Sequence, residues 1–191
     1  MRNDAAGDAM GASSTYARLM AAAKNPADMA TLALGGVLAR FVIKDLDTQS
    51  LDRLLDRYFP GTAPTALQPD HAHPDQVVCK ALSEQEYGDL LSLLREYRRD
   101  DAEENAWLAQ AMASACAGDN HLWQDMGLPN RELLSQLIRR YFPVLFYKNH
   151  SNMKWKKFFY KQLCDRAEVQ MCKAPSCGGC SDYLSCFGGE E

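Results

Sequence analysis

The sequence predicts an all-α protein, a compact helical domain followed by a C-terminal cysteine-rich loop. Apolar residues recur at three- and four-residue spacing through most of residues 25–166, which is the period of a helix. No stretch alternates apolar and polar residues between hairpin turns, as a strand would. The chain has 191 residues, 47% of them hydrophobic and 24% charged, which is typical of a globular domain.

The first half of the chain contains two predicted helices and a loop. An Asn-Pro pair at residues 25–26 predicts the start of the first helix, and Gly35 and Gly36 are expected to weaken or bend it. A second helix fits residues 48–59, where a Pro-Gly pair ends it. Four prolines then predict a long loop over residues 60–78.

The second half contains four more predicted helices. Ser83 and Glu86 have the spacing of a capping box, which opens the next helix. An acidic cluster at residues 100–104 suits the positive end of the helix that follows it. A further helix fits residues 129–143, and the last covers about residues 152–166. Two of the predicted helices end in Tyr-Phe-Pro, which indicates similar helix chemistry and not a repeat array.

These patterns divide the chain into three parts. We expect a partly flexible N-terminal segment over residues 1–24, a helical domain over residues 25–170 and a cysteine-rich loop and tail over residues 171–191. The tail has few aliphatic side chains to bury, so we expect it to become ordered around a ligand.

Composition and charge exclude several classes of function. The chain has 21 Lys and Arg against 25 Asp and Glu, a net charge of −4, so general nucleic-acid binding is not expected. No apolar run is long enough to span a membrane, and residues 1–14 lack the apolar core of a secretory signal. We therefore expect a cytoplasmic protein with reduced thiols. No catalytic triad or phosphate-binding loop is present, so we do not expect an enzyme.

A basic segment precedes the cysteine-rich tail. Residues 147–166 contain six basic side chains and one acidic one, a net charge of +5. Lys154, Lys157 and Lys161 are spaced so that they share one helix face, while the aromatic residues between them are expected to pack into the core. The lysine face predicts a docking surface for an acidic partner.

Four of the seven cysteines form a C-x4-C-x2-C-x5-C run, which consists of Cys172, Cys177, Cys180 and Cys186. Thiolates suit zinc, copper(I) or iron–sulfur clusters. A zinc site usually presents two C-x2-C-like pairs separated by a longer loop, whereas this run has one such pair and is compact, as cluster-binding sequences are. The spacing favours an iron–sulfur cluster over zinc, and a metal-free redox-sensitive tail is the third alternative.

Other cysteines and one histidine are secondary candidates. Cys164 lies eight residues before the run and is either an additional ligand or a buried helical thiol. His121 precedes a short aromatic helix, where it either binds metal, donates a hydrogen bond to a sulfide, or only begins the helix. Cys79 and Cys116 lie among apolar residues, so we expect both in the core.

Three blocks of sequence together resemble the NifQ family. They are NHLWQDMGL at residues 120–128, MKWKKF at residues 153–158 and the cysteine run ending in Cys186-Phe187, and the resemblance covers about residues 118–188. It implies a molybdenum-handling protein of nitrogen fixation that holds a Mo–Fe–S cluster, or a precursor of 4Fe–4S or 3Fe–4S type. It further implies donation of molybdenum for assembly of the nitrogenase iron–molybdenum cofactor. The implied metal source is molybdate, and the implied partners are the NifEN scaffold and the NifH Fe protein.

The residues are chemically compatible with that implication. Four cysteines would hold three irons and leave one thiolate, or an outside group, for molybdenum. The basic segment would offset the charge of a thiolate-bound cluster and attract molybdate, which is an oxyanion. Two other interpretations stay open: a small Fe–S electron-transfer protein and a zinc-stapled interaction module.

Overall fold

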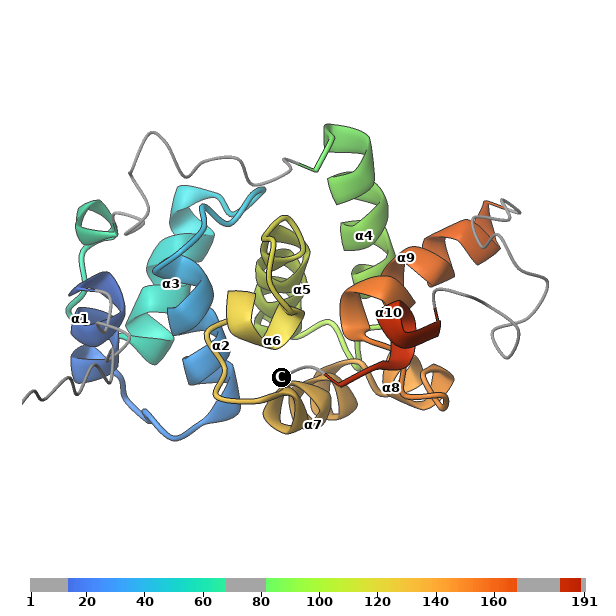
Figure 1. Ribbon diagram of the computed structural model, residues 1–191. Helices are drawn as coiled ribbons and strands as arrows, with labels where there is room; N and C mark the ends of the chain where they lie inside the picture. The colour runs from blue at the N-terminus through green and yellow to red at the C-terminus, as the bar shows by residue number, and fades with distance from the viewer. Residues whose placement is uncertain (1–13, 68–81, 168–182, 190–191) are drawn as a thin grey trace, which may run out of the picture.

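The computed structural model describes residues 14–67, 82–167 and 183–189. Across these residues every regular element is a helix and no strand occurs, which confirms the predicted all-α class (Figure 1). None of the described helices is long and apolar enough to cross a membrane. The elements in chain order are α1 (Ser14–Ala22), α2 (Met29–Leu38), α3 (Thr48–Tyr58), a 3-10 helix η1 (Pro64–Ala66), α4 (Glu84–Glu96), α5 (Glu103–Ala115), α6 (Leu122–Asp125), α7 (Arg131–Tyr141), α8 (Pro143–Lys148), α9 (Trp155–Arg166) and α10 (Tyr183–Phe187).

Helix α5 is the centre of the fold (Figure 1). It packs against α2 on one side and α4 on the other, and α9 lies against α4. Every residue from Trp107 to Ala115 is buried, and alternate alanines let neighbouring helices approach closely. Two of its buried polar side chains bond to one loop: Gln110 Nε2 donates to Asp45 O at 2.8 Å, and Ser114 Oγ accepts from Lys44 N at 3.2 Å. A helix without a polar face must be covered on all sides, and α5 is covered in this way from Trp107 to Ala115.

Helix α2 is continuous through Gly35 and Gly36, although the sequence predicted a weak or bent helix there. A Cβ atom on Gly36 would lie 2.2 Å from Met126 O and 2.7 Å from Gly127 Cα. Glycine is therefore required at position 36 because the backbone after α6 crosses α2 in direct contact. Gly127 itself has φ +67°, which favours glycine. This crossing fixes the position of α6.

Two predicted helix starts have different outcomes. The capping box is confirmed: Glu86 N donates to Ser83 Oγ at 3.1 Å, and Ser83 N donates to Glu86 Oε2 at 2.9 Å. The predicted start of the first helix at Pro26 is wrong, because Asp28 is the N-cap of α2. Its carboxylate accepts hydrogen bonds from Ala30 N and Thr31 N, both at 3.1 Å. A capping side chain that satisfies free N–H groups sets the boundary more strongly than a proline.

Three short helices were not predicted: α1, α8 and α10. Helix α8 begins at Pro143, the residue that was expected only to end the preceding helix; proline is well suited to a first helical position. Helix α10 lies in the tail that was expected to be a loop. Such short segments have little periodicity of their own, so tertiary contacts decide whether they are helical.

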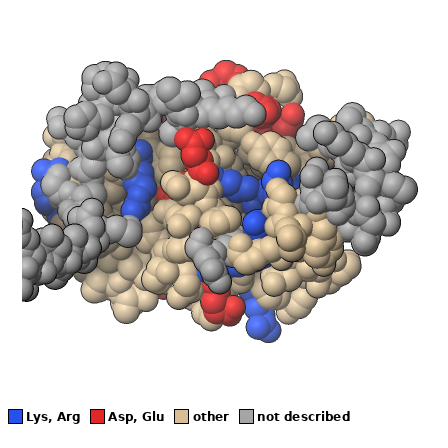
Figure 2. Space-filling view, in the orientation of Figure 1, with Lys and Arg blue, Asp and Glu red and all other residues tan. Residues whose placement is uncertain are grey.

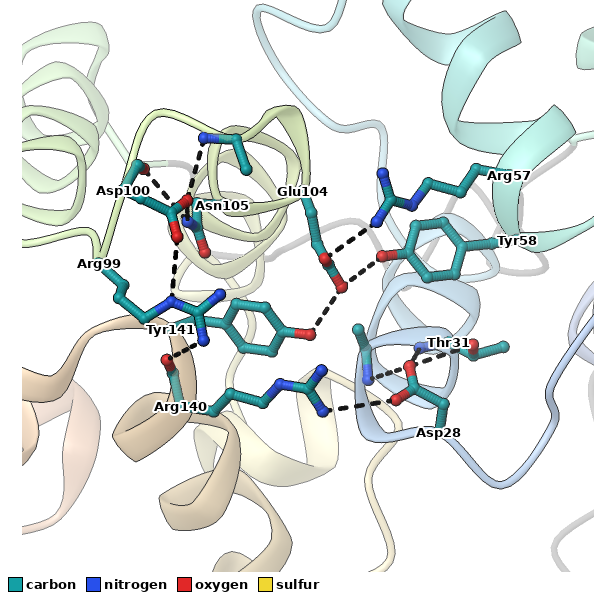
Figure 3. A network of polar contacts seen from close by, with 12 residues as sticks. Asp28, Thr31, Arg57, Tyr58, Arg99, Asp100, Glu104, Asn105, Arg140 and Tyr141 are labelled. Atoms are coloured by element: carbon teal, nitrogen blue, oxygen red, sulfur yellow. Dashed lines mark hydrogen bonds and ion pairs between the residues drawn. The ribbon is translucent and has the colours of Figure 1, made fainter.

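The two Tyr-Phe-Pro helices, α3 and α7, converge on one carboxylate (Figure 3). The hydroxyls of Tyr58 and Tyr141 each donate to Glu104 Oε1 at 2.6 Å, and Arg57 Nη2 lies 3.2 Å from Glu104 Oε2. Burial, followed by the contact with Glu104, raises the pKa of both phenols, which keeps them protonated as donors. The shared sequence therefore marks a shared structural role at the start of α5.

Candidate functional site

Of the four cysteines in the predicted ligand run, Cys186 lies in the described part of the chain, whereas Cys172, Cys177 and Cys180 lie outside the described residues. Cys186 is partly buried in α10 and packs against the core. Its carbonyl oxygen accepts a hydrogen bond from Lys154 N at 2.8 Å. This bond joins α10 to the N-cap residue of α9, so the last cysteine of the run is held at the start of the basic helix (Figure 1).

Helix α10 is stabilised by its own aromatic residues. The rings of Tyr183 and Phe187 stack with centroids 4.7 Å apart, and Phe187 packs against the core. Gly188 N donates to Leu184 O at 2.8 Å and ends the helix. These local contacts and the bond to α9 both fix the backbone position of Cys186.

Helix α9 turns its aromatic face to the core, as predicted. Trp155, Phe158 and Phe159 are buried, and Trp155 Nε1 donates to Ser135 Oγ at 3.1 Å. The lysines on the same helix consequently lie at its surface or at its edges.

The three lysines predicted to share a docking face have different surroundings. Lys161 Nζ donates to both carboxylate oxygens of Asp165, at 2.9 and 2.8 Å, one turn further along α9. The half-buried Lys154 and the exposed Lys157 border a hollow at the start of the helix. Neither of their amino groups has a hydrogen-bond or ion-pair partner within residues 14–67, 82–167 and 183–189.

A fourth lysine, which the sequence did not single out, joins α9 to α6. Lys156 Nζ lies 2.5 Å from Asp125 Oδ2 and donates to Gly118 O at 2.6 Å. The Asp125 side chain is only 4% exposed, and its Oδ1 accepts from Asn120 Nδ2 at 3.0 Å. A Cβ on Gly118 would lie 2.4 Å from the same carboxylate. In the sequence, nothing distinguishes Lys156 from its lysine neighbours.

His121 is the N-cap of α6, so the expected short helix after it is confirmed. Its backbone N–H donates to Gln124 Oε1 at 3.1 Å, and its side chain is half-buried. It lines the same hollow as Lys154 and Lys157. The hollow has a volume of about 190 Å³ and is formed by residues 120–122, residues 154–157 and Ser185; we call it the basic hollow. Figure 2 shows lysine and arginine side chains gathered between α6 and α9 on this face.

The remaining candidate cysteines do not line the basic hollow or lie outside the described residues. Cys164 is partly buried, ten residues after Lys154 on α9, about 15 Å along the helix axis. Cys116 is in the core as predicted, and burial raises the pKa of its thiol to about 12. Cys79 lies outside the described residues. Within the described ranges, no group of three or more His, Cys, Asp or Glu side chains is arranged to hold a metal ion.

Fold and site together define a class: a protein whose described part is all-helical and in which the C-terminal helix that carries Cys186 is bonded to a basic helix. The NifQ family model matches residues 21–188, and the chain belongs to that family. It is 41% identical over 150 residues to Protein NifQ of Azotobacter vinelandii, covering 76% of this chain and 77% of the relative. It is 35% identical over 156 residues to Protein NifQ of Rhodobacter capsulatus, covering 81% and 79%.

A shorter match to Protein NifQ of Klebsiella pneumoniae is 45% identical over 82 residues, 42% of this chain and 48% of the relative. No solved structure matches the chain. Membership of the NifQ family implies a role in nitrogen fixation, in the biosynthesis of the nitrogenase iron–molybdenum cofactor. The matched range includes the whole cysteine run and every residue of the basic hollow.

Proposed function

We propose that the protein is a metal-cluster carrier that holds a Mo–Fe–S cluster at Cys172, Cys177, Cys180 and Cys186 and donates its molybdenum for iron–molybdenum cofactor assembly. The observation that carries the proposal is the 2.8 Å bond from Lys154 N to Cys186 O. This bond joins the backbone of Cys186, the last cysteine of the run, to a helix start with three lysines in four residues.

The charges on both sides of this junction support the proposal. Thiolate-bound clusters are anionic, and their stability depends on nearby positive charge and hydrogen bonds. The ammonium groups of Lys154 and Lys157, on the adjacent helix, would supply that charge. In the run itself, Gly178 and Gly179 separate the inner cysteine pair, and glycine lets backbone N–H groups approach a sulfide.

As a carrier, the protein would exchange cargo with other proteins and would not catalyse a reaction. Its metal source would be molybdate, and its acceptors would be the NifEN scaffold and the NifH Fe protein. The lysine face of α9, with Lys154, Lys157 and Lys161, would contact an acidic surface of an acceptor. Such contacts mainly accelerate association and orient the partners, which suits a transfer complex that must also dissociate.

The test is elemental analysis of protein purified without oxygen from cells supplied with molybdate. The proposal predicts iron, acid-labile sulfide and molybdenum in the full-length protein. Alanine at any of the four positions of the cysteine run should reduce iron loading. Cys116→Ala is the matched control, because this thiol is buried in the core and is not part of the run, and Cys79→Ala is a second control.

Each other outcome would replace the proposal with a defined alternative. Iron and sulfide without molybdenum in every preparation would indicate an electron-transfer protein. Zinc alone would indicate a structural metal in an interaction module. Equal iron loading in the cysteine-run variants and the Cys116→Ala control would refute the ligand assignment.

A further inference from the structure

The basic hollow is an open depression bordered by residues from three separate elements. The loop before α6 contributes Asn120 and His121, the start of α9 contributes lysines, and α10 contributes Ser185. The buried Leu122 and Trp155 complete its wall, with 3% and 4% of their surfaces exposed. No Asp or Glu is among the described residues that line it.

Positive charge in the hollow is not neutralised within the described part of the chain. Of the three lysines, Lys156 alone has a partner there, and its ammonium group is taken up by Asp125 and Gly118. Lys154 and Lys157 have no such partner in the described ranges. Both also lie at the positive end of the α9 dipole, where anionic side chains are normally preferred. Cations at this end of a helix are modestly unfavourable, and a bound anion would remove that cost.

We infer that the basic hollow binds a tetrahedral oxyanion of the molybdate class. Two ammonium groups match a charge of −2, and the imidazole of His121, the amide of Asn120 and the hydroxyl of Ser185 offer further hydrogen bonds. A volume of about 190 Å³ far exceeds the roughly 10–15 Å³ that one water molecule needs on the same measure, so the hollow has room for a five-atom anion.

The place of the hollow connects the anion to the cysteine run. Ser185, which lines the hollow, precedes Cys186 directly, and the Cys186 carbonyl is bound to Lys154 N. An oxyanion held there would lie next to the last thiol of the proposed cluster site. This inference rests on the proposed function for its biological meaning, but anion binding itself does not require a cluster.

Isothermal titration calorimetry with sodium molybdate tests the inference. The titrated protein is the full-length chain with all four cysteines of the run replaced by alanine, so thiol coordination cannot produce the signal. In this background, K154Q with K157Q should weaken molybdate binding at least tenfold. Lys161→Gln is the matched control: it removes the same charge from the same helix, but outside the hollow, and should leave the affinity within twofold. Tungstate and sulfate should compete with molybdate, because they share its shape and charge.

Three results would overturn the inference. They are no molybdate binding by the cysteine-free background, unchanged affinity in K154Q with K157Q, and equal weakening by Lys161→Gln, which would indicate non-specific charge attraction. Circular dichroism and urea unfolding of each variant exclude loss of fold as the cause. Failure here with intact Fe and Mo loading of the native chain would refute the hollow and leave the carrier proposal standing. Molybdate binding by a chain that purifies with zinc alone would refute the carrier proposal and leave the assignment of the hollow standing.

Discussion

Replacement of Lys156 by methionine should cause a large loss of stability, because it leaves a buried carboxylate without its cation. The Lys156 and Asp125 side chains are 18% and 4% exposed, and their charged atoms lie 2.5 Å apart. After the substitution, Asp125 would keep, among the described residues, the hydrogen bond from Asn120 alone. Breaking a buried ion pair on one side costs about 3–5 kcal/mol, a large part of the 5–15 kcal/mol that stabilises a typical domain.

Urea unfolding followed by circular dichroism measures this loss. With an m-value of about 2–3 kcal/mol/M, the midpoint for Lys156→Met should fall by about 1–2 M. Lys161→Met is the matched control, since its pair with Asp165 is an exposed i,i+4 contact worth about 0.5 kcal/mol or less.

A double variant separates the lost charge pair from lost packing. Lys156→Met combined with Asp125→Leu should recover much of the stability, because an apolar pair of similar volume can replace a buried ion pair at little cost. Equal midpoints for Lys156→Met and the Lys161→Met control would refute the reasoning. A double variant that is less stable than the single one would show that the contact matters through its shape and not its charge.

Four further measurements test the packing and the stability of the helical domain. Tyr58→Phe and Tyr141→Phe should each lower the free energy of unfolding by about 1.5–3 kcal/mol in urea titrations, because each removes a hydrogen bond to a charged group; changes below about 0.5 kcal/mol would contradict this. Both phenols have raised pKa values, so the unfolded chain loses protons above pH 10 that the folded chain keeps. The free energy of unfolding should then fall by up to about 1.4 kcal/mol per pH unit for each phenol, and the two Phe variants should flatten this slope. Gly36→Ala should destabilise the protein by about 1–3 kcal/mol or more, whereas Gly88→Ala, with open space around its Cβ, should stabilise it by about 0.5–1 kcal/mol; the same sign for both would argue against the close crossing. Cys116 should resist Ellman's reagent at pH 8 until the chain is unfolded, because its thiol is buried and protonated; rapid labelling of the native protein would place it outside the core.

The sequence was informative where one residue type has one physical role. Apolar spacing predicted the longer helices, and the capping box at Ser83 and Glu86 formed as expected. Gly36 was misjudged because its role depends on a backbone segment about ninety residues away, at Met126. A local pattern shows that glycine weakens a helix but does not show that another chain segment requires it.

The site shows the same limit more clearly. MKWKKF contains lysines at positions 154, 156 and 157, which look equivalent in the sequence. In the structure, Lys156 enters a buried ion pair while Lys154 and Lys157 border the hollow. The difference is decided by Asp125 and the carbonyl of Gly118, which come from a different part of the chain. Helix α10 was missed for a related reason, since its stability depends on Phe187 and the bond to α9.

Two charged clusters in the described part of this molecule differ in charge compensation: one is surrounded by compensating groups and the other is not. At the start of α5, the carboxylate of Glu104 receives two phenol hydrogen bonds and one arginine, so its charge is fully compensated. At the start of α9, Lys154 and Lys157 face a hollow with no compensating acid among the residues that line it, at the helix end that already carries positive potential. The same chain supplies compensating side chains at Glu104, so it could have supplied an acidic side chain beside Lys154 and Lys157 as well. Natural chains depart from stability rules mainly at functional sites, so the uncompensated cluster next to Cys186 supports our inference that an anion binds there.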